Sequence, residues 1–134
     1  MARRKTKSQR QPRSEEPTGT LRVIGGRLRG KPIEYLGDPI TRPMKQRVRE
    51  AAFNLVGSRV KGTHVLDLFA GTGALTWEAI SRGALSATLL ERHFPCARLV
   101  EKNARDLGLE SQVQVLAGDT FYWVRQLDFA NLSE

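Results

Sequence analysis

The segment that most constrains the fold spans residues 64–78 and reads H-V-L-D-L-F-A-G-T-G-A-L-T-W-E. A short apolar run, residues 65–69, is interrupted only by Asp67 and leads into a small-residue turn, residues 70–73, here called the glycine loop. A helical pattern then begins at Ala74. A buried strand that enters a helix through glycines is typical of α/β sheets that bind nucleotide-like cofactors. Glycine permits the close backbone approach that such a ligand needs, so Gly71 and Gly73 are predicted at a ligand. The alternative is a tight turn without a ligand.

The residues around the glycine loop indicate which cofactor fits. Thr76 stands where a dinucleotide-binding G-x-G-x-x-G motif has its third glycine, which disfavours NAD-like ligands. Asp67, just before the apolar strand ends, favours S-adenosyl-L-methionine, because the ammonium group of its methionine part requires a nearby carboxylate.

A second strand is predicted over residues 87–90, after a helix whose buried side includes Leu75, Ala79 and Ile80. Glu91 closes that strand about 20 residues beyond the glycine loop, the distance at which an acid accepts from ribose hydroxyls in dinucleotide-binding folds. A plain surface acid at a strand end is the alternative.

A third strand is predicted over residues 113–116, after a helix over 95–107 that ends at Gly108. The inward positions of this helix are predicted to be Ala97, Val100, Ala104 and Leu107. Asp119 follows the strand and is placed either to accept from an adenine amino group or to cap a helix over 121–127.

Positive charge is concentrated at the N-terminal end. Residues 1–50 contain 14 Lys/Arg and 5 Asp/Glu, whereas residues 51–134 contain 8 and 9. Residues 1–18 have no apolar period, so they are expected to be a disordered basic arm that either solubilises the chain or contacts phosphates. Such an asymmetry favours a polyanionic partner.

Residues 21–35 are predicted to form a β-hairpin with a tight turn at Gly25-Gly26. Alternation would then place Arg27, Arg29 and Lys31 on one face of the ribbon, where they suit phosphate contacts; an ordinary solvated face is the alternative.

A helix is predicted to begin near Met44, after Arg42-Pro43, and to end at Gly57. Val48, Ala51, Ala52 and Leu55 fall at helical spacing and are predicted to face the core, with Lys45, Arg47 and Arg49 pointing elsewhere.

The bulk composition excludes several classes of protein. A chain of 134 residues holds one domain at most. The single cysteine, Cys96, excludes an internal disulfide, and His64 and His93 lack partners at metal-ligand spacing, so no metal is expected. No apolar run approaches the ~20 residues of a membrane span, and no secretory signal is recognisable, so a cytoplasmic location is expected.

The chain resembles the RsmD-type methyltransferases, which modify guanine N2 in small-subunit (16S) ribosomal RNA. The matching stretches are R-V-I-G-G-R-L-R-G-K (22–31), R-P-M-K-Q-R-V-R-E-A-A-F-N (42–54), V-L-D-L-F-A-G-T-G-A-L (65–75) and E-A-I-S-R-G-A (78–84). The resemblance implies a Rossmann-like, class I methyltransferase fold preceded by a hairpin and a helix. It divides the chain into the arm 1–18, a hairpin-and-helix region 19–60 facing RNA and cofactor, and the front of the cofactor-binding domain, 61–134.

By this resemblance S-adenosyl-L-methionine is the cofactor, and ribosomal RNA or the small ribosomal subunit is the partner of an enzyme that is monomeric when complete. Its expected cofactor-binding residues are Asp67, Phe69, Gly71, Gly73, Glu91, Asp119, Arg42 and Pro43. Its expected RNA-binding residues are Arg22, Arg27, Arg29, Lys31 and Arg47.

The D/N-P-P-F/Y loop, which orients the acceptor amine in the family, does not occur in this sequence. The chain is therefore expected to be a C-terminally truncated form, with an incomplete sheet and no turnover alone. Two other functions stay open at this point: a non-catalytic RNA-binding protein, and a methyltransferase acting on adenine in DNA or on a protein amide.

Overall fold

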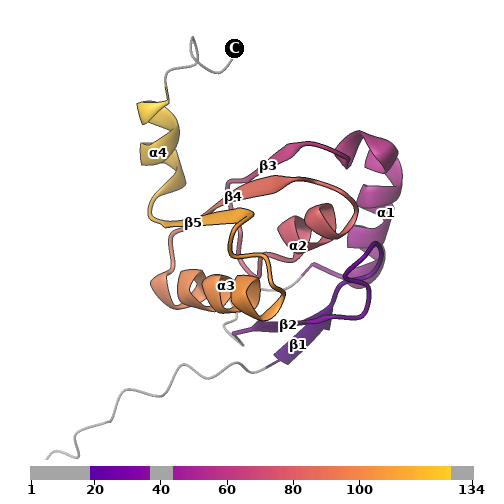
Figure 1. Ribbon diagram of the computed structural model, residues 1–134. Helices are drawn as coiled ribbons and strands as arrows, with labels where there is room; N and C mark the ends of the chain where they lie inside the picture. The colour runs from indigo at the N-terminus through magenta and orange to yellow at the C-terminus, as the bar shows by residue number, and fades with distance from the viewer. Residues whose placement is uncertain (1–18, 37–43, 128–134) are drawn as a thin grey trace, which may run out of the picture.

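Residues 19–36 and 44–127 are described by the computed structural model (Figure 1). The basic arm, Arg42 and Pro43 lie outside the described residues, so the expectations for them stay predictions. The elements, in chain order, are β1 (Gly19–Arg22), β2 (Pro32–Tyr35), α1 (Gln46–Val56), the 3-10 helix η1 (Gly57–Val60), β3 (His64–Asp67), α2 (Ala74–Ser81), β4 (Ser86–Glu91), α3 (Phe94–Asp106), β5 (Val113–Ala117) and α4 (Thr120–Gln126).

The predicted parallel sheet is confirmed. Its three strands lie in the order β3-β4-β5, with Val65 opposite Ala87 and Leu89 opposite Val115. Helix α2 connects β3 to β4, and α3 connects β4 to β5, because parallel neighbours require a crossover connection. The carboxyl ends of all three strands therefore meet at one edge, beside the glycine loop (Figure 1).

Helices α2 and α3 pack on one face of this sheet. The shared core contains Ala79 and Ile80 from α2, Val100 and Ala104 from α3, and Ala87 and Leu89 from β4. The three predicted inward positions in α3, and Leu107 directly after it, are all buried, at 9% exposure or less. Leu75 is the exception in α2, because it is 37% exposed at the rim.

The two N-terminal strands pair antiparallel as predicted, but the expected tight turn at Gly25-Gly26 is wrong. Leu21 pairs with Ile33 and Arg22 with Pro32, which leaves residues 23–31 as a long connection, here called the basic loop. Arg27, Arg29 and Lys31 lie in this loop rather than on a strand, so the prediction that strand alternation places them on one ribbon face is wrong. The loop folds inward instead, with Val23 and Leu28 buried in the core.

Helix α1 ends at Val56 with Gly57 as its C-cap, as predicted, but its predicted buried face is wrong. Val48 and Leu55 are 48% and 85% exposed. The buried residue is Arg49, at 1% exposure, and Phe53 packs partly against the core. Pairing of this arginine with a buried acid, described below, overrides the apolar pattern.

The hairpin also packs against α3. Asn103 of α3 accepts a hydrogen bond from the Glu34 backbone N–H and donates one to the Glu34 carbonyl, at 3.1 and 2.9 Å. Ile33, fully buried, belongs to the same core as the sheet. The hairpin region and the sheet therefore form one packed unit.

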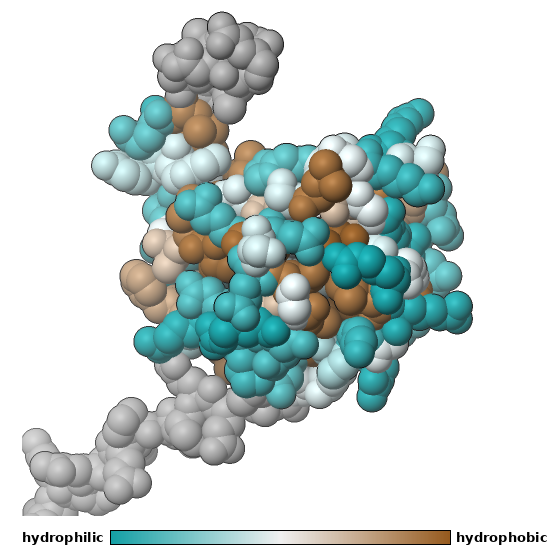
Figure 2. Space-filling view, viewed as in Figure 1, coloured by the Kyte–Doolittle hydropathy of each residue, from teal (hydrophilic) through white to brown (hydrophobic). Residues whose placement is uncertain are grey.

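An apolar groove of about 310 Å³ runs between α1, β3 and α2. Figure 2 shows apolar side chains gathered across the middle of the visible face, with polar ones around them. Val56 and Leu66, which line the groove, are 41% and 45% exposed. Within the described residues, no helix is both long and apolar enough to cross a membrane.

Candidate functional site

The glycine loop turns sharply between β3 and α2. Gly71 and Gly73 both adopt left-handed backbone angles, with φ of 53° and 76°. The Ala70 N–H donates to the Leu90 carbonyl at 3.0 Å, which holds the loop against β4. A Cβ on Gly73 would lie 2.7 Å from Nε1 of the buried Trp77, so this position requires glycine.

Asp67 lies at the end of β3, half-buried beneath this loop. Its carboxylate accepts from the Thr76 hydroxyl at 3.0 Å and from the Phe69 N–H at 3.4 Å. Burial raises the pKa of Asp67 above 3.8, and repulsion from Glu91 raises it further, against the lowering effect of the two hydrogen bonds. A cation placed here would relieve the penalty on the charged form.

Glu91 lies at the end of β4 and holds the glycine loop. Oε2 accepts from the Gly71 N–H at 2.8 Å, and Oε1 accepts from the His93 N–H at 3.0 Å. The predicted acid therefore faces the predicted glycine across the strand ends. These bonds orient the carboxylate toward the loop.

Asp119 follows β5 and caps α4, because its carboxylate accepts from the Tyr122 N–H at 3.0 Å. The capping role predicted as one alternative is thus observed. Asp119 also lines a hollow of about 240 Å³ together with Glu91, Phe69 and Phe121.

Two exposed aromatic rings border this hollow. Phe69 and Phe121 are 70% and 65% exposed, and their centroids lie 6.1 Å apart in an edge-to-face arrangement. Large apolar rings this exposed are suited to a planar apolar ligand. Phe121 was not among the sequence-predicted residues, although an aromatic two residues after Asp119 was available as a signal.

The carboxylates and the hollow at this edge of the sheet fit the chemical groups of S-adenosyl-L-methionine. A half-buried carboxylate suits an ammonium group, a second carboxylate suits a hydroxyl pair, and the aromatic-bordered hollow suits a purine. Glu91 is hydrogen-bonded to the glycine loop at Gly71, and Asp67 lies near enough to Glu91 for the two carboxylates to repel one another. Asp119 shares the hollow with Glu91.

The predicted RNA-binding cations lie on a different part of the surface. Arg22 ends β1, Arg27, Arg29 and Lys31 occupy the basic loop, and Arg47 lies in α1; all five are exposed. Arg27 donates to the Gln112 side chain at 3.2 Å, and Arg22 donates to the Gly30 carbonyl at 2.8 Å. These bonds fix two of the cations at the surface.

Sequence reasoning missed the residues that support the site from α2. Thr76, fully buried, orients Asp67, and Trp77 donates to the Thr72 carbonyl at 3.3 Å. Thr76 in place of the third glycine was a usable signal. Among the described residues, no group of three or more His, Cys, Asp or Glu side chains could hold a metal ion.

Comparison with curated proteins finds relatives with related names. The Escherichia coli protein named ribosomal RNA small subunit methyltransferase D is 40% identical over 90 residues, covering 67% of this chain and 46% of that protein. The YlbH protein of Bacillus subtilis, with a name that also refers to rRNA methyltransferase, is 36% identical over 99 residues, covering 74% and 54%. The chain thus spans about half the length of the curated relatives it matches.

Solved structures show the same fold. The Escherichia coli yhhF protein aligns with a TM-score of 0.73 and 34% identity, covering 81% of this chain and 57% of that one. An RNA methyltransferase from Salinibacter ruber aligns at 0.53 with 22% identity, covering 60% and 52%, a likeness of fold alone. The architecture is that of the class I methyltransferases.

A family profile described as conserved hypothetical protein 95 matches residues 21–130. That range includes the second half of β1, all of β2 and α1, the glycine loop and all three parallel strands. The chain therefore belongs to this family, the RsmD-type family that the sequence resembles.

Proposed function

We propose that this chain binds the methyl donor S-adenosyl-L-methionine for an RNA methyltransferase that modifies guanine N2 in small-subunit ribosomal RNA. One observation carries the donor assignment: Asp67, Glu91 and Asp119 lie at the carboxyl ends of three adjacent parallel strands, around a glycine loop. Ligands of open α/β sheets bind at this edge.

Each carboxylate has a distinct role in the proposal. Asp67 pairs with the donor's ammonium group, which lowers the cost of its burial. Glu91 accepts from the ribose hydroxyls, exchanging its present bond to Gly71 for a ligand contact. Asp119 accepts from the adenine amino group while the purine lies against Phe69 and Phe121.

The donor supplies an electrophilic methyl group on sulfur. The chain binds and orients it, because the glycine loop admits the donor close to the backbone and the strand-end acids fix both of its ends. Arg42 and Pro43 are proposed to close over the methionine end.

The RNA assignment has two supports. Relatives from Escherichia coli and Haemophilus influenzae, 40% and 34% identical, carry names that refer to methylation of small-subunit ribosomal RNA. In addition, the exposed cations of the basic loop and Arg47 offer phosphate contacts without requiring a particular base sequence.

Guanine N2 as the acceptor rests on the family resemblance. Non-catalytic RNA binding is the second candidate for this chain, supported by the exposed cations of the basic loop. The two candidates differ in donor binding, which only the first requires.

Isothermal titration with S-adenosyl-L-homocysteine tests the proposal. The wild-type chain should bind it, and Glu91→Ala should weaken binding at least about tenfold, because a charge-assisted hydrogen bond contributes about 1.5–3 kcal/mol. Glu110→Ala serves as the matched control. It removes an exposed acid that is not part of the proposed donor site, so this variant should bind as tightly as wild type. Failure of the wild-type chain to bind would refute the donor assignment.

A further inference from the structure

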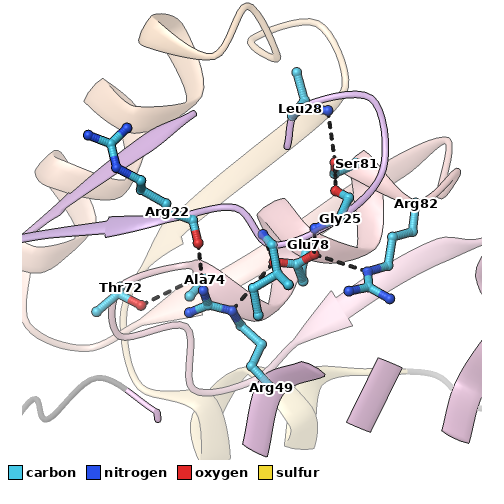
Figure 3. A network of polar contacts seen from close by, with 10 residues as sticks. Arg22, Gly25, Leu28, Arg49, Thr72, Ala74, Glu78, Ser81 and Arg82 are labelled. Atoms are coloured by element: carbon cyan, nitrogen blue, oxygen red, sulfur yellow. Dashed lines mark hydrogen bonds and ion pairs between the residues drawn. The ribbon is translucent and has the colours of Figure 1, made fainter. Parts of the chain in front are cut away.

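Helix α2 carries a buried acid that the proposed donor site does not use. Glu78 is fully buried, and four groups converge on its carboxylate (Figure 3). The backbone N–H groups of Ile24 and Gly25 donate to it at 2.6 and 3.1 Å. Arg82 Nε donates at 3.0 Å, and Arg49 Nε lies 3.5 Å away as an ion pair. A buried carboxylate with this many donors holds its partners tightly, because separating it from them would leave buried polar and charged groups without a partner.

The groups that converge on Glu78 come from segments far apart in sequence. Ile24 and Gly25 belong to the basic loop, and Arg49 belongs to α1. Arg49 extends the network, because its Nη2 donates to the Arg22 carbonyl at 2.6 Å. The carboxylate thus fixes both cation-bearing segments against one turn of α2.

Ser81, one turn further along α2, makes a second attachment to the basic loop. Its hydroxyl accepts from the Leu28 N–H at 2.9 Å and donates to the Gly25 carbonyl. The Ser81 carbonyl accepts from the Arg27 N–H at 2.9 Å. A Cβ on Gly26 would lie 2.0 Å from this carbonyl oxygen, so the loop backbone lies directly against the helix.

The first turn of the same helix supports the glycine loop. Ala74 N–H donates to the Thr72 hydroxyl at 3.1 Å, and Thr76 donates to Asp67. Helix α2 has only eight residues, so its two ends lie about 12 Å apart at 1.5 Å per residue. One short rigid helix therefore joins the candidate donor site to the basic loop.

We propose that Glu78 is a positioning residue that holds the basic loop in a fixed place relative to the glycine loop, so that bound RNA meets the donor site in one register. This inference rests on the proposed function. Glu78 is too deeply buried to touch RNA, so it acts through the backbone of the loop that carries Arg27, Arg29 and Lys31.

The proposal makes a prediction opposite to that of simple electrostatics. Glu78→Gln removes a negative charge, which by charge alone would tighten binding to RNA. If Glu78 positions the loop, the same change should weaken binding about tenfold, because the freed loop must be ordered on association. The dependence of affinity on salt should keep its slope, since the cations that contact phosphate are retained.

The test measures RNA binding and amide hydrogen exchange on the full chain, with a small-subunit ribosomal RNA fragment as the probe. Glu78→Gln should weaken binding at unchanged salt slope and speed exchange at Ile24 and Gly25, while β4 amides stay protected. Glu110→Gln makes the same charge change at an exposed position and should bind no more weakly than wild type. Arg29→Gln, a direct contact in the proposal, should instead reduce the salt slope by roughly one unit.

Ser81→Ala provides a second variant, because Glu78→Gln leaves Arg49 with an unpaired buried charge and could prevent folding. Ser81→Ala loosens the loop at Leu28 without changing any charge, and it should also weaken RNA binding. If folded Glu78→Gln or Ser81→Ala binds RNA as tightly as wild type or more tightly, the positioning role of Glu78 is refuted, while the RNA assignment stands. Absence of RNA binding by the wild-type chain would refute the RNA assignment itself.

Discussion

The ionised carboxylate of Asp67 lowers the stability of the folded chain but is needed for the proposed binding of the methyl donor. Its carboxylate is partly desolvated at the end of β3, and burial raises its pKa above the ordinary value of 3.8. A group whose pKa is raised by folding stabilises the folded state most below its unfolded pKa, and that contribution disappears as pH rises through the folded pKa. At neutral pH the ionised carboxylate therefore costs stability, which a bound ammonium group would restore.

The neutral variant Asp67→Asn should separate these two effects. We expect it to be more stable than wild type at pH 7, with the difference shrinking as pH falls toward 4, because the wild-type carboxyl then becomes protonated. Urea unfolding at several pH values measures this. A stability difference that does not vary with pH would show that desolvation of the charge is unimportant at this position.

The role of Asp67 in binding the methyl donor is tested by Asp67→Ala, which should weaken binding of S-adenosyl-L-homocysteine by about ten- to a hundredfold. The ammonium group would lose its charged partner, at a cost of about 1.5–3 kcal/mol or more. Isothermal titration at neutral pH provides the measurement. Unchanged affinity would show that Asp67 does not pair with the ammonium group.

The two roles of Asp119 can be separated by substitution with another capping residue. Asp119→Ser should keep the α4 cap, since serine caps helices about as well, but should weaken donor binding about tenfold. Asp119→Ala should lose both, including about 1 kcal/mol of stability. Equal donor affinity in Asp119→Ser and wild type would leave capping as the role of this residue.

At the scale of elements, the glycine loop demands a specific backbone. Gly73 and Gly108 have nearly the same left-handed φ, 76° and 72°. Only Gly73 has a buried neighbour where a Cβ would project, namely Trp77, whereas nothing lies within 4 Å of that position at Gly108. Substitution at Gly108 therefore reports backbone strain alone, whereas substitution at Gly73 reports strain together with a steric clash.

Alanine at these two glycines should have unequal costs. Gly108→Ala should lose about 1–2 kcal/mol, the cost of a left-handed conformation for a residue with a Cβ. Gly73→Ala should lose clearly more, because Trp77 is fully buried and cannot move aside freely. Urea unfolding of both variants gives the comparison, and equal losses would contradict the close packing of loop and helix.

Local sequence patterns predict the parallel sheet and the helices that follow its strands well. The glycine loop, β4, α3 and β5 follow apolar periodicity and glycine stops, because their partners lie next to them in the sheet. The acids at the strand ends were predictable for the same reason. Their meeting at one edge follows from parallel topology.

The structures of the basic loop and of α1 were predicted poorly, because the residues that contact them are distant in sequence. Arg49 reads as a surface cation until Glu78, 29 positions later, is known to lie opposite it. The basic loop resembles a tight hairpin turn, but Glu78 and Ser81 draw residues 23–28 onto α2. Tertiary contacts of buried polar groups overrode the local preference in both places.

At the scale of the 134-residue chain, the sequence contains a candidate donor site and a basic surface but no D/N-P-P-F/Y loop. We therefore expect the 134-residue chain to bind donor and RNA without transferring a methyl group, since orientation of the acceptor contributes several kcal/mol to such reactions. Incubation with radiolabelled S-adenosyl-L-methionine and small-subunit ribosomal RNA measures transfer. Label in the RNA above background would show that another part of this chain orients the acceptor.

The position at which S-adenosyl-L-methionine binds decides whether the glycine loop and the strand-end acids form its site. Titration of S-adenosyl-L-methionine into ¹⁵N-labelled protein, followed by amide NMR, reports every backbone position at once. We expect saturable shifts at Gly71 and Gly73 and at the amides around Glu91 and Asp119, with Gly108 unaffected as an internal control. Saturation with no shift at the glycine loop, or with shifts confined to another surface, would contradict it.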